Sequence, residues 1–232
     1  MPNTTTAEAA DFLELKAAAK QFRAAITKYR QGNPGQPKGL LDGTPVPIEP
    51  SLLDGARLIA DRRVAFEHIP SHAVACEVGV QTGQFSKELF EKYDLAELHL
   101  VDSRLDKMTV AYEDVLLGSR VFKHEGMSWD VLATFPNDKF DWIYIDAAHD
   151  YAAVKKDLEQ ACRVVKPGGY VICNDYTTWS WSEGVAYGVV AAVNECVNER
   201  KWPVRYLALN HMGYHDLAFQ RPSTTRPSHD AA

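Results

Sequence analysis

Short apolar runs alternate with helical segments from residue 73 onward, and this alternation constrains the fold more than any other feature of the chain. Nearly continuous apolar runs stand at 73–78, 97–102, 120–126, 140–146 and 169–175. Helical periodicity fills the intervals, at about 84–93, 105–117, 151–164 and 183–199. Strands that are apolar on both sides and are separated by helices are typical of a parallel sheet covered on both faces. The sequence therefore predicts a doubly wound α/β domain.

The last two apolar runs are joined in a different way. They stand at 204–210 and 214–221, and only His211, Met212 and Gly213 separate them. So short a connection can close a hairpin but cannot make a parallel crossover, so the final strand is expected to run antiparallel. The sequence thus predicts a mostly parallel seven-stranded sheet with a C-terminal antiparallel hairpin. The polar tail, 222–232, is expected to be disordered.

Two helices and a linker are expected before the sheet. Residues 7–30 carry apolar side chains at helical spacing and then break at a stretch that contains Gly and Pro. A second helical pattern runs from Leu52 to about Phe66, with Ser51 as its expected N-cap. We therefore assign 1–70 to an N-terminal helical appendage and linker, and 71–221 to the sheet domain. The apolar stripe of the first helix suits packing on its own domain or on a second copy, as in a homo-oligomer.

The composition excludes several classes of protein. A formal net charge of −6 disfavours a chain whose main task is to grip nucleic-acid phosphates. No apolar run approaches the ~20 residues of a membrane span, and the first residues lack the basic and apolar segments of a secretory signal. The four cysteines lie far apart without metal-ligand spacing, which favours buried thiols in a reducing compartment. We expect a cytoplasmic protein with no membrane and no nucleic-acid partner.

A glycine turn follows the first apolar run. Glu77, Gly79 and Gly83 form an E-x-G-x-x-x-G pattern that leads from a strand into a helix. Such a turn lets an open α/β sheet hold a nucleotide-like ligand at its carboxyl edge, although the third glycine of the dinucleotide-binding pattern is missing. Asp102 ends the next strand about 20 residues further on, where a carboxylate can bind ribose hydroxyls. On the alternative interpretation, the glycines only make a turn and Asp102 caps the next helix.

Polar side chains also follow the fourth and fifth apolar runs. Asp146 ends one run, and Asn174 and Asp175 end the other. Because neighbouring parallel strands end at the same edge of a sheet, we expect these side chains to converge there. Two carboxylates and an amide oxygen suit Mg²⁺ or a similar divalent cation, which would lower the pKa of a bound substrate hydroxyl. Alternatively, Asp146 only caps the helix that begins near Tyr151.

In these motifs the chain resembles the class I S-adenosylmethionine-dependent methyltransferases, over about residues 73–221. Their first motif has the same acid–glycine–glycine form, and their sheet ends in an antiparallel hairpin. The resemblance implies a Rossmann-like methyltransferase fold and S-adenosylmethionine as cofactor. It implies contacts with the methionine part from the glycine turn, with the ribose from the acid after the second strand, and with adenine from the segment after the third strand. The implied cofactor residues are Glu77, Gly79, Gly83, Asp102, Ser128, Trp129 and Asp146.

The segment 140–176 more narrowly resembles the family of macrolide-sugar O-methyltransferases and cephalosporin-hydroxylase-like proteins. It carries that family's D-x-x-H-x-Y pattern at Asp146, His149 and Tyr151, followed by a helix, a Pro-Gly-Gly turn and a strand. The family then has an acidic pair, whereas this chain has Asn174 in the first position. The resemblance implies metal-dependent methylation of a hydroxyl, with Asp146 and His149 as catalytic residues and His149 as the general base. Taken alone, a histidine in a loop is more often solvated or structural than catalytic, and only its position three residues after Asp146 makes the catalytic role of His149 equally plausible.

The sequence therefore predicts an enzyme that transfers a methyl group from S-adenosylmethionine to a small-molecule hydroxyl. A divalent cation held by Asp146, Asn174 and Asp175 is expected to assist. One alternative is a metal-independent N- or O-methyltransferase in which the acidic cluster is structural. Another is a non-catalytic protein that uses the same fold to hold a nucleoside or an assembly partner.

Overall fold

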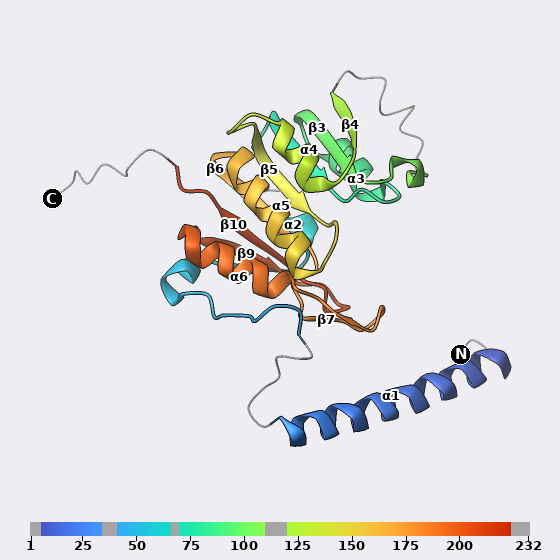
Figure 1. Ribbon diagram of the computed structural model, residues 1–232. Helices are drawn as coiled ribbons and strands as arrows, with labels where there is room; N and C mark the ends of the chain where they lie inside the picture. The colour runs from blue at the N-terminus through green and yellow to red at the C-terminus, as the bar shows by residue number, and fades with distance from the viewer. Residues whose placement is uncertain (1–5, 34–40, 66–69, 110–119, 224–232) are drawn as a thin grey trace. The chain divides into compact units, whose positions relative to one another are not determined.

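The computed structural model describes residues 6–33, 41–65, 70–109 and 120–223, and the chain divides into two compact units, 1–40 and 41–232 (Figure 1). The first unit holds one long helix, α1 (Thr6–Gly32), which confirms the helix expected over 7–30. The second unit holds the sheet and the other described elements. A role of α1 in a homo-oligomer stays a prediction, and most of the tail expected to be disordered lies outside the described residues.

A sheet of eight strands forms the centre of the second unit, in the order β1-β9-β10-β6-β5-β2-β3-β4. The strands β6, β5, β2, β3 and β4 run parallel to one another. β10 runs antiparallel to both β6 and β9, so the doubly wound sheet and the C-terminal hairpin are confirmed. The bounds are β1 (Arg57–Ile59), β2 (Ala73–Val78), β3 (Leu95–Asp102), β4 (Val121–Glu125), β5 (Phe140–Ile145), β6 (Val165–Cys173), β9 (Val204–Ala208) and β10 (Asp216–Gln220).

Helices cover both faces of this sheet. On one face, α4 (Ser128–Thr134), α5 (Tyr151–Val164) and α6 (Val189–Arg200) contribute to one buried apolar cluster, and Figure 1 shows these three helices on the same side. On the other face, α3 (Gln84–Lys92) and the short α2 (Arg62–Ala65) pack against a second cluster. Because the central strands lie between two apolar layers, they need no polar face, which explains their nearly continuous apolar runs.

The sequence of α5 shows why these helices form where they do. Asp150 is the N-cap, and its side chain accepts a hydrogen bond from the backbone N–H of Ala153 at 3.0 Å. Val154, Leu158 and Ala161 follow at helical spacing and are buried against the sheet. Asp150, rather than Asp146, therefore caps this helix, which leaves the side chain of Asp146 available for another role.

The prediction of a helix over 52–66 is wrong. That segment instead contains a 3₁₀ turn, η2 (Pro50–Leu53), the strand β1 and the short helix α2. Gly55 has a φ of +76°, in the left-handed region, which ends the helical path. β1 then pairs in parallel with β9, and these interstrand hydrogen bonds outweigh a weak local helical pattern.

Two other helices differ from their expected bounds. The helix expected from residue 183 begins only at Val189, because Gly184 has a φ of +70° and the preceding segment forms a small antiparallel pair, β7 (Trp179–Ser180) with β8 (Val185–Ala186). Of the helix expected over 105–117, the structure describes only a 3₁₀ turn, η4 (Leu105–Lys107), and residues 110–119 lie outside the described residues.

The N-terminal part reaches the sheet earlier than expected. The part that clusters by itself ends at Leu40, and β1 and α2 pack with the sheet. Arg62 of α2 also pairs with Asp216 of β10, with 3.4 Å between Nε and Oδ2. The division of the chain into 1–70 and 71–221 stays a prediction, and these contacts join β1 and α2 to the sheet.

The carboxyl ends of β2 and β5 approach each other very closely at Gly79. The backbone N–H of Asp146 donates to the carbonyl of Val78 at 2.7 Å, and that of Gly79 donates to Val101 at 2.8 Å. A Cβ on Gly79 would lie 1.9 Å from the carbonyl oxygen of Asp146, well inside contact distance. Gly79 also has a φ of +88°. Only glycine satisfies both conditions, and the two strand ends are thereby held together.

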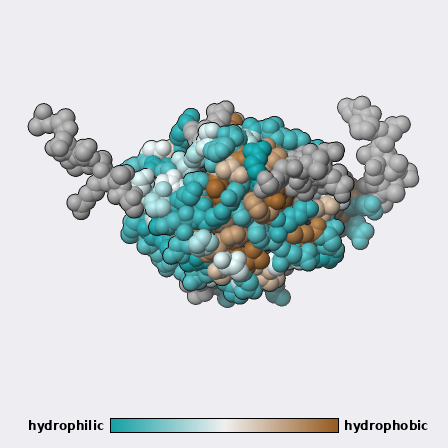
Figure 2. All heavy atoms as spheres, turned by 90° about the horizontal axis from the view of Figure 1, so that it is seen from above, coloured by the Kyte–Doolittle hydropathy of each residue, from teal (hydrophilic) through white to brown (hydrophobic). Residues whose placement is uncertain are grey.

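One face of the molecule is mainly hydrophilic. Seen from above in Figure 2, teal side chains cover most of the face, and apolar ones gather near its middle. In the described ranges, no helix combines the length and the apolar character needed to cross a bilayer. Most large apolar side chains of the central strands lie in the two internal clusters, whereas Leu58 of β1 and Phe122 of β4 are exposed.

Gly79→Ala is expected to destabilise the domain by about 3 kcal/mol or more, because the new methyl group collides with the backbone of Asp146 and the residue has a left-handed φ. Gly213→Ala is the matched control. Gly213 has almost the same φ, +86°, but nothing lies within 4 Å of its added Cβ, so only a backbone cost of about 1 kcal/mol is expected. Urea unfolding of both variants measures the difference, and equal losses would contradict the close approach.

Candidate functional site

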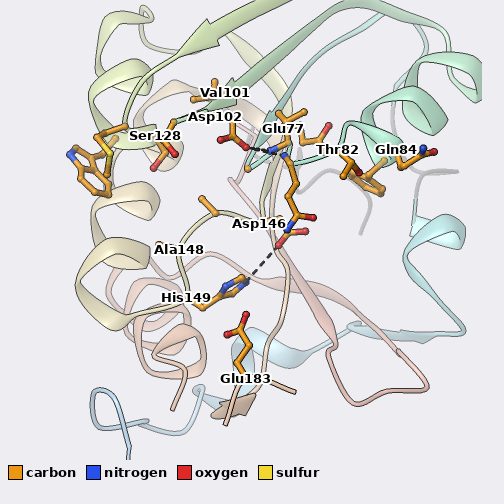
Figure 3. A pocket seen from close by; sticks show the side chains of 18 residues that line it. Glu77, Thr82, Gln84, Val101, Asp102, Ser128, Asp146, Ala148, His149 and Glu183 are labelled. Carbon is orange, nitrogen blue, oxygen red and sulfur yellow. Dashed lines mark hydrogen bonds and ion pairs between the residues drawn. The ribbon is translucent and has the colours of Figure 1, made fainter. Parts of the chain in front are cut away.

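A pocket of about 540 Å³ lies at the carboxyl edge of the sheet (Figure 3). It is lined by the turn after β2, the end of β3, the start of α4 and the loop between β5 and α5. In Figure 3, Asp102 and Ser128 lie toward one end and His149 and Glu183 toward the other. This volume is in the range of pockets that hold small molecules and cofactors. The pocket is therefore elongated, with chemically different ends.

The glycine turn and Asp102 form one hydrogen-bonded unit. Oδ2 of Asp102 accepts from the backbone N–H groups of Val80 and Gln81, at 2.8 and 2.9 Å, and Oδ1 accepts from that of Arg104 at 2.8 Å. Although burial raises the pKa of Asp102, these donors lower it below its ordinary value. The carboxylate is thus charged and held in place, and it lines the pocket. The side chain does not cap η4, whose N-cap position is Arg104.

Gly83 begins α3 in the left-handed conformation, with a φ of +81°. Its carbonyl accepts from the backbone N–H of Lys87 at 3.0 Å, which starts the hydrogen-bond ladder of the helix. Between the two glycines, Gln81 also has a positive φ, of +50°. Three residues of the turn, Gly79, Gln81 and Gly83, therefore have a left-handed backbone conformation. Residues 79–82 line the pocket.

Glu77 lines the same pocket from beneath the turn, and only 2% of its surface is exposed. Its Oε2 has no hydrogen-bond partner among the described residues. Burial raises the pKa of Glu77 to about 8, and the nearby carboxylates of Asp146 and Asp102 add to the effect. At neutral pH this carboxyl is therefore mainly protonated, and it is available to a ligand.

The segment after β4 lies at the end of the pocket near Asp102. Met127, Ser128 and Trp129 line the pocket at the start of α4. The Nζ of Lys156 lies 4.4 Å from the centre of the Trp129 ring, a cation–π contact that orients the indole. The sequence-predicted adenine residues Ser128 and Trp129 thus share a pocket with Glu77, Gly79 and Asp102.

His149 lies between two carboxylates. Its Nε2 is 3.6 Å from Oδ1 of Asp146 and 3.4 Å from Oδ2 of Asp175. Its ring stacks on Tyr187, with 4.4 Å between ring centres and 9° between the planes. Burial lowers the pKa of His149, but Asp146 and Asp175 outweigh burial and raise it above the ordinary value. The pKa of Asp175 is raised to about 6 by its own burial and by Asp146.

The sequence prediction lacks three residues that lie near the site: Glu183, Tyr187 and Arg62. Glu183 lines the pocket, and its Oε2 accepts a hydrogen bond from the Tyr187 hydroxyl at 2.8 Å. The charge of Arg62 acts on Asp146 and Asp175. It favours the charged form of Asp175 and so opposes the rise in the pKa of that acid. In the sequence, the glycines Gly184 and Gly188 could have indicated a loop rather than a helix around Glu183. Nothing local in the sequence indicates the place of Arg62.

The predicted metal site does not form. Nδ2 of Asn174 donates to the Tyr144 hydroxyl at 3.0 Å and to Oδ1 of Asp216 at 2.9 Å, within a buried network. Asn174 does not line the pocket, and Nε2 of His149 lies near both Asp146 and Asp175. Within the part of the chain that the structure describes, no group of three or more His, Cys, Asp or Glu side chains is arranged to hold a metal ion. The expectation of a divalent cation on Asp146, Asn174 and Asp175 is therefore not supported.

Comparison with known families points to the same part of the chain. Residues 76–176 match the family model described as a methyltransferase domain. The uncharacterized protein R132 of Acanthamoeba polyphaga mimivirus is 33% identical over 101 residues. These residues are 41% of this chain and 42% of that protein, so the match spans less than half of the relative's length.

Solved structures resemble the chain over most of its length. The N-methyltransferase NodS from Bradyrhizobium japonicum WM9, in complex with S-adenosyl-L-homocysteine, has a TM-score of 0.53 at 14% identity, over 70% of this chain and 84% of that one. For a SAM-dependent methyltransferase from Aquifex aeolicus the TM-score is 0.51 at 17% identity, over 74% and 93%. For the [4+2]-cyclase SpnF it is 0.54 at 12% identity, over 69% and 80%. The chain therefore has the Rossmann-like fold of the SAM-dependent methyltransferases.

Glu77→Gln is expected to stabilise the unliganded protein, increasingly so as the pH rises from about 4.5 to about 8. Below this range the carboxyl is protonated in both the folded and the unfolded state. Within it only the unfolded state loses the proton, which costs the native protein up to about 1.4 kcal/mol per pH unit. The glutamine removes this cost. Thermal unfolding between pH 5 and 9 measures it, with the exposed Glu91→Gln as control, and a pH-independent difference would contradict the raised pKa.

Proposed function

We propose that the chain is a methyltransferase that uses S-adenosylmethionine to methylate a hydroxyl of a small molecule, with His149 as general base. The observation that carries the proposal is the position of His149 in the same pocket as the glycine turn and Asp102, beside two carboxylates. The match of residues 76–176 to a methyltransferase domain supports it. We include in the proposal a cytoplasmic location and an acceptor that is not a nucleic acid.

The residues present fit the cofactor. Residues 79–82 line the pocket, so a ligand can approach the backbone of the turn. Three of the roughly four lone pairs of the Asp102 carboxylate accept backbone N–H groups, and the one left on Oδ1 suits a ribose hydroxyl. Ser128 and Trp129 suit a base. Glu77 offers a buried oxygen without a partner. When bound, S-adenosylmethionine supplies an electrophilic methyl group.

The cationic cofactor also gives Glu77 a role that its burial otherwise leaves unexplained. A positive charge beside a buried carboxyl favours its ionised form. We expect the pKa of Glu77, about 8 in the unliganded protein, to fall when the cofactor binds. The protein thus avoids a bare buried charge when the pocket is empty, and it acquires a charged partner when the pocket is filled.

The task of His149 is to accept the proton of the acceptor hydroxyl. A neutral imidazole can do this, and the resulting imidazolium is stabilised by Asp146 and Asp175 on either side of Nε2. Stacking on Tyr187 holds the ring plane, and the carbonyl of His149 is held by the N–H of Gly188 at 2.8 Å. A base fixed in this way needs little reorganisation when charge develops. We assign no step to a metal ion.

Asp102→Ala is expected to weaken binding of S-adenosylhomocysteine by at least tenfold. The change removes a charge-assisted hydrogen bond to the ribose, worth roughly 1.5–3 kcal/mol, together with the acceptor that holds the turn. Calorimetry measures the affinity. Asp106→Ala is the control, because Asp106 is an exposed acid four residues away that pairs with Arg104. Equal affinities for wild type and Asp102→Ala would remove the ribose assignment.

His149→Ala is expected to lower kcat by about 10²–10⁴ while leaving the affinity for S-adenosylhomocysteine nearly unchanged, as for loss of a general base. Transfer of a labelled methyl group to acceptors found by screening hydroxyl-bearing small molecules measures the rate. His72→Ala, which alters an exposed histidine beside Asp94, is the control. A tenfold or smaller loss would show that His149 is structural or contacts the substrate only.

The same assay tests the protonation state of His149. Activity is expected to fall as the pH drops through the pKa of His149, with a midpoint above about 6.5, because only the neutral ring accepts a proton. Asp175→Asn should move this midpoint to lower pH.

In the same assay, a chelator is expected to leave the rate of methyl transfer unchanged. Loss of activity that Mg²⁺ restores would support the metal-dependent mechanism instead. Cofactor binding without turnover on any hydroxyl or amine acceptor would instead favour a binding protein.

A further inference from the structure

Two buried cysteines meet where α5 packs on α6, away from the pocket of the proposed reaction. The Sγ atoms of Cys162 and Cys196 are 3.6 Å apart, although the two residues are separated by 34 positions in the chain. Both side chains belong to the apolar cluster beneath these helices. A disulfide bond needs about 2.0 Å between its sulfur atoms, so an approach of roughly 1.5 Å would bring these two to bonding distance. The pair is therefore close enough for oxidation to join it.

Contacts on the same helices hold the two thiols near each other. Gly188, the N-cap of α6, packs so tightly on α5 that a Cβ there would lie 2.2 Å from the backbone nitrogen of Tyr151. One turn further along α5, Nζ of Lys155 pairs with Oε1 of Glu195 at 2.7 Å. The Tyr151 hydroxyl donates to the same carboxylate, and Glu195 directly precedes Cys196. Because these contacts fix the two helices relative to each other, the short distance between the thiols follows from the fold.

Cys196 is the member of the pair that a small reagent can reach. It lines a second pocket, of about 230 Å³, which Cys162 does not line. Arg200 lies one turn further along α6 and lines the same pocket, so positive charge and sulfur lie on the same side of the helix. A hydrogen bond from the Cys162 thiol, together with the charge of Arg200, lowers the pKa of Cys196 despite its burial. The thiolate, which is the reactive form of a cysteine, is therefore favoured at Cys196.

The other two cysteines of the chain lack these features. Cys76 lies on β2 and Cys173 on β6, both are fully buried, and neither lines the pocket of Cys196. Burial raises the pKa of both thiols. Reactivity is therefore expected at one pair, with Cys76 and Cys173 as internal controls in the same chain.

We infer that Cys162 and Cys196 form a redox-sensitive pair, which a hydroperoxide such as hydrogen peroxide converts to a disulfide bond between α5 and α6. The thiolate of Cys196 attacks one peroxide oxygen, the O–O bond breaks, and the departing hydroxide takes a proton from the solvent to become water. The sulfur of Cys162 then attacks the sulfenic acid sulfur of Cys196. The S–S bond forms, the S–O bond breaks, and the hydroxyl group leaves with the thiol proton as a second water molecule. The two thiols lose two electrons, which the peroxide gains, and a dithiol reductant reverses the change by exchange.

The experiment treats the reduced full chain with hydrogen peroxide, with glutathione oxidised in parallel to calibrate the dose. Alkylation in denaturant, digestion and mass spectrometry then count the thiols that remain. We expect a form that has lost two hydrogen atoms, a peptide that links Cys162 to Cys196, and unmodified Cys76 and Cys173. Dithiothreitol should restore all four thiols. In urea, where the contact between α5 and α6 is lost, this selectivity should disappear.

Single variants separate the tasks of the two cysteines. In Cys162→Ala the reaction should stop at the sulfenic acid of Cys196, which dimedone traps, and in Cys196→Ala dimedone labelling should be at least tenfold lower. Cys173→Ala, which removes a buried thiol of the same apolar cluster, should still give the linked peptide at the wild-type rate. Four free thiols in the native wild type, at a dose that oxidises glutathione, overturn the inference, as does a linked peptide that joins any other two cysteines. The wild-type measurement decides the matter even where a variant fails to fold.

Discussion

The close approach of β2 and β5 at Gly79 is the constraint on which the rest of the site depends. A single methyl group there would collide with the carbonyl of Asp146, so the two strand ends meet only because the residue is glycine. This contact brings the glycine turn after β2 beside the loop after β5. The first carries the backbone N–H groups that Asp102 holds, and the second carries Asp146 and His149. The residues proposed to bind the cofactor and those proposed to react thus share one pocket.

Burial of charge gives this pocket its chemical character. Glu77, Asp157 and Asp175 are acids whose burial raises their pKa, whereas backbone donors keep that of Asp102 low. Carboxyl groups in one small region therefore differ in charge at neutral pH, according to which donors each one meets. In the proposed reaction these differences assign the tasks. Asp102 is charged and can accept from a hydroxyl group, and Glu77 gains a cationic partner when the cofactor binds.

The structure corrects the sequence prediction where local and long-range preferences compete. The segment 52–66 has a helical pattern, but Gly55 interrupts it, and β9 offers an unpaired edge to which β1 adds. Asn174 ends the strand expected to supply a metal ligand, yet its amide faces Tyr144 and Asp216. The sequence indicates which strand end carries a polar group. It does not say toward which neighbour that group turns, because Asp216 lies 42 residues further along the chain.

The sequence by itself determined the doubly wound sheet, because apolar runs and helical periodicity are local properties that pair in few ways. It also determined the glycine turn, Asp102 and the loop with Asp146 and His149 at one sheet edge, since parallel strands end on the same side. Only the tertiary structure decided that Asp175 and Tyr187 contact His149 and that the Asn174 amide turns toward Tyr144 and Asp216. These are contacts between side chains far apart in sequence. Their direction depends on packing and burial, which no local pattern encodes.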